Sequence, residues 1–130
     1  MANKPAPVIL IVDDDPFLRM LTAEFVNEAG FETLEAGDAD QAIAILESCS
    51  EIAVLFTDIN MPGSMDGLKL ARVVSNRWPV IEVLIASGHV LLQQADLPPN
   101  GRFLRKPYRA EAMIADLHSL VSHAAPLTQA

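Results

Sequence analysis

The chain has little cysteine, few basic residues and no long apolar run, and each shortage excludes a class of protein. Its single cysteine, Cys49, cannot form an internal disulfide, which favours a reducing, cytoplasmic location. Nine basic against 17 acidic residues give a net charge of −8, so we expect no nucleic-acid partner, because such surfaces neutralise phosphates with lysine and arginine. No apolar run is long enough to span a bilayer, and residues 1–7 do not resemble a signal peptide. We therefore expect no membrane partner either.

The composition is that of a small domain with a substantial core. The sequence has 130 residues, which is too short for a second domain. Hydrophobic residues make up 51% of it, which is enough to form a buried core. It contains no internal repeat and no linker. We expect one domain over residues 1–123 and a short tail over 124–130.

Five short apolar runs alternate with helical segments along the chain. The run from Val8 to Val12 is continuous and β-branched, as in a strand buried on both faces. The other predicted strands cover residues 31–35, 52–56, 80–86 and 102–104. Alternating strands and helices predict an α/β fold of five βα units, in which a doubly wound parallel sheet is covered on both faces.

The helix signals vary in strength. Asp15 and Asp38 are predicted N-caps, and Gly30 should end the first helix. Apolar residues at helical spacing mark that first helix: Phe17, Leu18, Leu21, Phe25 and Val26. Further helices are predicted at about residues 67–78 and 108–122. Residues 89–95 allow at most about two turns before the prolines at 98 and 99, so the fourth helix should be shortened.

Acidic residues follow the first predicted strand. Asp15 is best explained as a helix cap, and a solvated turn is the simplest reading for Asp13 and Asp14. Adjacent carboxylates at the rim of a sheet repel each other, however, and a cation would offset that repulsion. Mg²⁺ takes oxygen ligands from one or two carboxylates and is the natural candidate.

Three further polar residues lie at the ends of later strands. Taken singly, Asp58 would be a loop cap, Ser87 a turn residue and Lys106 a surface charge. In a parallel sheet the carboxyl ends of neighbouring strands share one edge, so these side chains should converge. A phosphorylated aspartate there would find a hydroxyl, an ammonium group and a metal ion for its oxygens.

The sequence resembles the receiver-domain family of bacterial two-component signalling over nearly its whole length. Five short motifs carry the resemblance, in residues 11–15, 57–62, 65–68, 86–88 and 103–108. Their joint occurrence in this order is highly specific. The resemblance implies a flavodoxin-like strand order of 2-1-3-4-5 and a cytoplasmic, free-standing receiver.

The resemblance also implies a metal site and a phosphoacceptor. Asp58 would accept a phosphoryl group from a histidine kinase or a histidine phosphotransfer protein. Asp14, Asp58 and the backbone carbonyl of Asn60 would bind Mg²⁺, with Mn²⁺ as an alternative ion, and Asp13 would act largely through water. Such a chain catalyses only its own phosphorylation and dephosphorylation, so it is not counted as an enzyme.

Other residues match the family's switch and lifetime positions. Lys106 would pair with carboxylate or phosphoryl oxygens, Ser87 would be the switch hydroxyl and Phe103 the aromatic switch residue. The Lys106–Pro107 bond is expected to be cis, against a base rate of about 5–6% for such bonds. Two side chains would tune the lifetime of the phosphorylated state: Asn60 and His89.

Two departures from the family concern the surface around the site. The loop over residues 61–67 is one residue longer than the commoner form, and the interval from Ser87 to Lys106 is short. The second departure alters the usual output face, so contact with a downstream protein target need not follow the family's standard mode. The hypothesis is that the fourth helix is reduced to one or two turns or is mobile.

Two other functions are compatible with parts of the sequence. Asp13-x-Asp15 superficially fits the motif of Mg²⁺-dependent phosphatases of the haloacid-dehalogenase type, but Phe17 stands where that motif has threonine or valine. The chain also lacks a second acidic pair near its C-terminal part. A degenerate receiver that binds partners without phosphorylation is the other alternative, although no acidic residue or lysine of the motif is missing.

Overall fold

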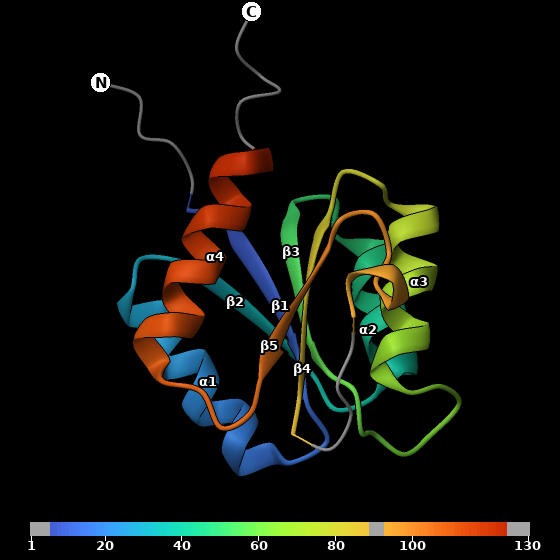
Figure 1. The fold of residues 1–130 in the computed structure, drawn as a ribbon, viewed down its shortest axis with the longest axis horizontal. Coiled ribbons are helices and arrows are strands. Elements are labelled where there is room, and N and C mark those ends of the chain that lie inside the picture. The colour runs from blue at the N-terminus through green and yellow to red at the C-terminus, as the bar shows by residue number, and fades with distance from the viewer. Residues whose placement is uncertain (1–5, 89–92, 125–130) are drawn as a thin grey trace, which may run out of the picture.

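A single parallel sheet forms the centre of the protein (Figure 1). The structure is a computed structural model that describes residues 6–88 and 93–124. The sheet has the order β2-β1-β3-β4-β5, as predicted. Its strands are β1 (Val8–Val12), β2 (Glu32–Ala36), β3 (Ile52–Asp58), β4 (Glu82–Ser87) and β5 (Gly101–Arg105). The helices are α1 (Pro16–Glu28), α2 (Ala39–Ser48), α3 (Gly67–Arg77) and α4 (Ala110–Ala124), with a 3-10 turn η1 (Gln94–Asp96).

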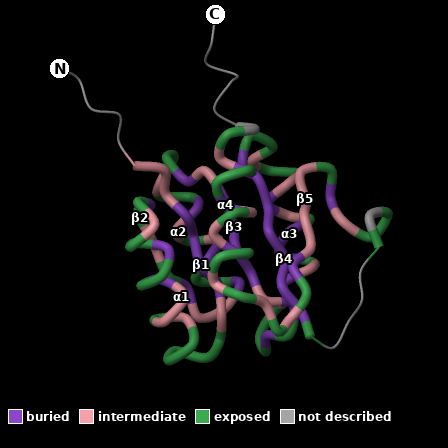
Figure 2. Tube along the Cα trace, turned by 60° about the vertical axis from the view of Figure 1, so that its left-hand side comes forward, coloured by how far each residue is buried: buried purple, intermediate pink, exposed green. Residues whose placement is uncertain are grey.

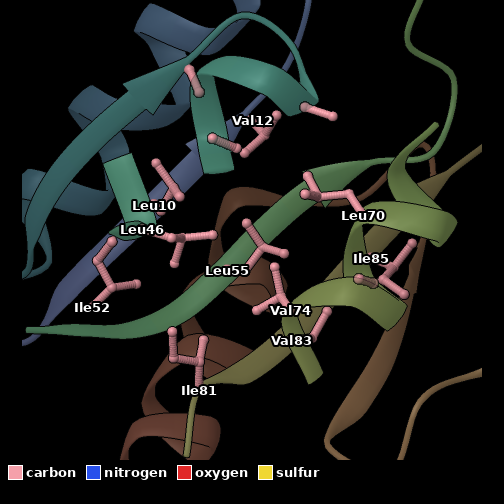
Figure 3. Packing of buried hydrophobic residues seen from close by; sticks show 14 of the residues in the cluster. Leu10, Val12, Leu46, Ile52, Leu55, Leu70, Val74, Ile81, Val83 and Ile85 are labelled. Atoms are coloured by element: carbon pink, nitrogen blue, oxygen red, sulfur yellow. The ribbon is translucent and has the colours of Figure 1, made fainter. Parts of the chain in front are cut away.

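Helices cover both faces of the sheet, α1 and α4 on one side and α2 and α3 on the other (Figure 1). Successive residues of β1 alternate between the two layers: Leu10 packs with the α2–α3 cluster, and Ile11 with the α1–α4 cluster. Figure 2 shows the central strands as largely buried, and Figure 3 shows the packing around Leu55 and Leu70. The continuous apolar runs of the sequence thus become strands buried on both faces.

The predicted caps of α1 and α2 are confirmed. The Asp15 carboxylate accepts hydrogen bonds from the backbone N–H groups of Phe17 and Leu18, at 3.0 and 3.2 Å. Asp38 caps α2 in the same way, and α1 ends before Gly30, whose φ of 102° suits glycine best. These caps begin α1 shortly after β1 and α2 shortly after β2.

Most of the apolar residues that predicted α1 are not on its buried face. Ala23 and Val26 pack onto the sheet, whereas Phe17, Leu18 and Phe25 are 61%, 46% and 47% exposed. The predicted helix is therefore confirmed, and of the five apolar residues that marked it only Val26 is buried.

In the described residues between β4 and β5, Gly88 and 93–100, the one helical piece is the 3-10 turn η1. This agrees with a shortened fourth helix, and residues 89–92 of the stretch predicted for that helix lie outside the described residues. Arg72 of α3 holds this turn by donating to the backbone carbonyl of Asp96, at 3.1 Å. His89 lies outside the described residues. Within the described part of the chain, no helix combines the length and the apolarity that a bilayer span requires.

Candidate functional site

The polar strand ends converge at one edge of the sheet. Asp13 directly follows β1, Asp58 is the last residue of β3, Ser87 is the last of β4, and Lys106 directly follows β5. The strands are parallel and in register here: Asp58 pairs with Ala86, the neighbour of Ser87. The parallel strand order β1-β3-β4-β5 therefore brings these side chains to adjacent strand ends.

Three carboxylates form the centre of this site. Oxygen atoms of Asp13, Asp14 and Asp58 lie within 4.8 Å of one another. Lys106 places its ammonium nitrogen Nζ 3.1 Å from Oδ1 of Asp58, whose side chain is 14% exposed. One lysine thus faces three acidic groups, and the site carries excess negative charge suited to a divalent cation.

The environment of Asp13 makes its negative charge costly. Burial raises the pKa of the Asp13 carboxyl above its usual range, and the charges of Asp58 and Asp14 add to this. A hydrogen bond from the backbone N–H of Asp15, at 3.0 Å, and the charge of Lys106 act in the opposite direction. A bound cation would relieve the remaining cost, so the chemistry of this donor set fits a metal ion.

A cavity of about 580 Å³ opens above the carboxylates. Leu18 and Thr22 of α1 line one side, Asn60 lies on the loop after β3, and Lys106 and Tyr108 are on the β5–α4 connection. Leu18, Thr22 and Tyr108 had no predicted role in the site. Leu18 and Thr22 are one helical turn apart on α1, which is the spacing that could have indicated a shared lining.

Tyr108 is the main site residue that sequence reasoning missed. It follows the Lys106–Pro107 bond, which is cis as predicted. Burial raises the pKa of the Tyr108 hydroxyl, and its hydrogen bond with Thr22 acts in the opposite direction. The side chain is therefore a neutral phenol at the cavity wall. The negative charges of Asp13 and Asp58 are close enough to raise its pKa further.

Two predicted switch residues, Ser87 and Phe103, are not among the residues that line the cavity. Ser87 is buried, and its backbone carbonyl accepts a hydrogen bond from the N–H of Lys106 at 3.1 Å. Phe103 is half-buried in the edge strand β5. Its neighbour Leu104 belongs to the α1–α4 cluster, so strand alternation directs Phe103 to the α2–α3 face.

A close backbone approach supports the end of β3. A Cβ atom added to Gly67, the first residue of α3, would lie 1.8 Å from the backbone oxygen of Asp58. The N–H of Gly67 donates to the carbonyl of Ile59 at 2.8 Å, and Asp66 caps α3. The lengthened loop is tied to α2 by a 2.7 Å hydrogen bond from Ser64 to Asp40. This loop therefore returns tightly to the residue that carries the central carboxylate.

Comparison with known proteins gives a consistent family. The model of the response regulator receiver domain matches residues 9–118. The transcriptional regulatory protein AruR of Pseudomonas aeruginosa is 40% identical over 83 residues, covering 61% of this chain and 34% of that protein. The nitrogen assimilation regulatory protein NtrX of Azorhizobium caulinodans is 33% identical over 110 residues, covering 82% of this chain and 24% of that protein. The chain thus spans about a third or less of these relatives.

Solved structures agree with this pattern. A response regulator receiver protein from Sinorhizobium medicae has a TM-score of 0.83 at 28% identity, covering 92% of this chain and 97% of that chain. A receiver domain protein from Clostridium thermocellum has the same TM-score at 25% identity, with 94% and 99% covered.

Proposed function

The chain belongs to the response regulator receiver domain family of two-component systems, and from this premise we propose that Asp58 is its phosphoacceptor. One observation supports this most strongly. The Asp58 carboxylate lies at an open cavity, 3.1 Å from the lysine ammonium group and within 4.8 Å of two other carboxylates. A nucleophile, a counter-charge and a metal-binding set thus lie close together, as phosphoryl transfer requires.

In the proposed reaction, an oxygen of Asp58 attacks the phosphorus of a phosphohistidine. A phosphorus–oxygen bond forms as the phosphorus–nitrogen bond breaks, and the departing imidazole keeps the electron pair and takes up a proton. Hydrolysis later reverses the state: water attacks the phosphorus, inorganic phosphate leaves, and the carboxylate is restored. In this proposal the chain catalyses its own phosphorylation and dephosphorylation and has no turnover of a separate substrate.

The donor set fits Mg²⁺, which receiver domains generally bind in an acidic pocket. Asp13, Asp14, Asp58 and the backbone carbonyl of Asn60 would hold it, and Mn²⁺ offers the same preference for oxygen ligands. When bound, the ion neutralises charge on the transferred group. The raised pKa of Asp13 supports this assignment, because burial, and after it the neighbouring carboxylates, make the negative charge of Asp13 costly.

Lys106 and Ser87 supply the remaining contacts in the proposal. The Lys106 ammonium group already faces Asp58 and would hold a phosphoryl oxygen. The Ser87 hydroxyl would donate to another phosphoryl oxygen and thereby shift β4. With Phe103 on the adjacent strand, that shift would alter the surface around β5, which is the logic of a phosphorylation switch. Asn60, at the cavity rim, would influence access of the hydrolytic water.

The exposed side of α1 supports a docking role for the phosphohistidine protein. Among the described residues, most large hydrophobics with high exposure belong to α1: Phe17, Leu18, Met20 and Phe25, with Val80 as the exception. Leu18 also lines the cavity, so this apolar surface runs to the reactive carboxylate. Receiver domains are phosphorylated by histidine kinases, and we propose that the kinase or a phosphotransfer protein covers this surface.

Intact-protein mass spectrometry tests the function. Incubation with a small-molecule phosphodonor and Mg²⁺ should add one phosphoryl group to the wild type, and chelation should prevent it. Asp58→Asn should abolish the adduct, whereas Asp66→Asn should retain it, since asparagine also caps helices. An unmodified wild type, or an adduct that persists in Asp58→Asn, would contradict the proposal.

The phosphatase alternative has less support from the site. Its motif needs Asp13 and Asp15 together, but the Asp15 carboxylate caps α1 and is outside the carboxylate cluster. A phosphorylation-independent interaction module has no specific observation in its favour, because the acidic residues and Lys106 are all brought together.

A further inference from the structure

Arg19 links three elements next to the acidic cluster. From the first turns of α1, its Nη1 donates to the backbone carbonyl oxygen of Asp13, at 2.8 Å. Its Nε donates to Oε1 of Glu35 in β2, at 3.1 Å. The guanidinium group is thus used at two of its donor positions, and its side chain is largely shielded from solvent. A planar fork of donors is required to make both contacts at once.

The Asp13 carbonyl has a special place in the site. It belongs to the peptide group that joins Asp13 to Asp14, the two acidic residues after β1. The ladder with β2 ends nearby, where the N–H of Asp13 donates to the carbonyl of Ala36 at 3.1 Å. Beyond this point, the hydrogen bond from Arg19 orients that peptide plane. Because the plane sets the direction of both flanking residues, it also sets where their carboxylates point.

We propose that Arg19 is a positioning residue for divalent-cation binding, holding the Asp13–Asp14 peptide so that the carboxylates converge with Asp58. This inference rests on the proposed function, since it presupposes the cation site. Glu35 fixes the guanidinium from the other side and keeps it directed at the carbonyl. Groups that orient the residues of a metal site typically change metal affinity about 10–100-fold when removed.

A positioning role and a charge effect make opposite predictions. Arg19 is a cation beside a cation site, so its charge alone disfavours Mg²⁺, and its removal should then tighten binding. If the hydrogen bond to the carbonyl dominates, removal should weaken binding. A merely structural role would lower the free energy of unfolding and leave the affinity unchanged.

Calorimetric titration with Mg²⁺ alone separates these cases. We expect Arg19→Gln to bind Mg²⁺ about tenfold more weakly than the wild type. Arg19→Lys should also bind more weakly, although it keeps the charge, because one ammonium group cannot replace the fork. The matched control is Arg77→Gln, which removes another Arg–Glu pair, the 2.9 Å contact with Glu47. Its affinity should stay within about twofold of the wild type, as expected for an exposed pair.

Circular dichroism verifies that the variants fold. If Arg19→Gln does not fold, the Mg²⁺ affinity of Arg19→Lys tests the positioning role. Unchanged or tighter binding in the folded Arg19 variants would overturn the positioning role while leaving the proposed function intact. The positioning role would also be overturned if Arg77→Gln lost affinity to the same extent. Absence of Mg²⁺ binding in the wild type would instead overturn the cation site itself, and the role of Arg19 with it.

Discussion

The contact between Gly67 and Asp58 allows a quantitative prediction for Gly67→Ala. The added methyl group would lie 1.8 Å from the backbone oxygen of Asp58 and 2.9 Å from Cα of Ile59. Both atoms are backbone, so no side-chain rotation relieves the overlap. Ordinary contact distances require α3 and the end of β3 to separate by about 1–2 Å. The substitution would therefore displace Asp58, the proposed phosphoacceptor.

The cost follows from two terms. Overpacking costs about 1–3 kcal/mol, and disturbing the 2.8 Å hydrogen bond from Gly67 to Ile59 adds about 1 kcal/mol. We expect Gly67→Ala to lower the free energy of unfolding by about 2–4 kcal/mol. A misplacement of about 1 Å can also slow a reaction about 100-fold, so phosphorylation of Asp58 should slow at least tenfold.

Urea unfolding followed by Trp78 fluorescence measures the first effect, because Trp78 packs against the α2–α3 core. Intact mass against time with a small-molecule phosphodonor measures the second. Asp66→Asn is the control: it changes the residue next to Gly67, keeps a side chain that can cap α3, and adds no atom to the contact with Asp58. A loss in Gly67→Ala below about 1 kcal/mol, with normal phosphorylation, would refute the reasoning.

Three further predictions concern the charges and the docking surface. Lys106→Gln should slow phosphorylation of Asp58 about 10–100-fold by removing the facing cation, yet tighten Mg²⁺ binding, as phosphorylation rates and calorimetry would reveal. The raised pKa of Asp13 means that the folded state holds this proton more tightly than the unfolded state, so the free energy of unfolding of the metal-free protein should fall as pH rises through that pKa. Asp13→Asn should reduce this fall in a urea series across pH, and an unchanged slope would contradict the assignment. Phe25→Ser should slow phosphorylation by a phosphohistidine protein about tenfold but not by a small phosphodonor, whereas Val80→Ser, another exposed apolar position, should change neither rate.

The fold and the central residues were predictable because both depend on order and periodicity. Continuous apolar runs identify strands buried on both faces, and parallel strands necessarily bring Asp13, Asp58 and Lys106 to one edge. Strand boundaries were less certain: β4 begins at Glu82, two residues later than predicted, and leaves Val80 exposed. Hydrophobicity alone does not determine the residue at which the backbone hydrogen bonds of a strand begin.

Contacts between side chains from distant parts of the chain were not predictable. The bond from Arg19 to the Asp13 carbonyl involves a backbone atom, which leaves no mark in a residue pattern. Phe17 and Phe25 match the core-facing periodicity of a helix but lie on the outer side of α1, since the helix carries two apolar sides. Which side meets the sheet depends on packing against β1 and α4, and spacing does not encode that choice.

The most direct test of the central claim is to locate the phosphoryl group. Borohydride reduces an acyl phosphate to an alcohol, so a phosphorylated aspartate becomes homoserine, which peptide mass spectrometry identifies by position. After incubation with Mg²⁺ and a small-molecule phosphodonor, the proposed function predicts this conversion at Asp58 alone, and only when Mg²⁺ is present. Conversion at Asp13 or Asp14, or none at any aspartate, would contradict it.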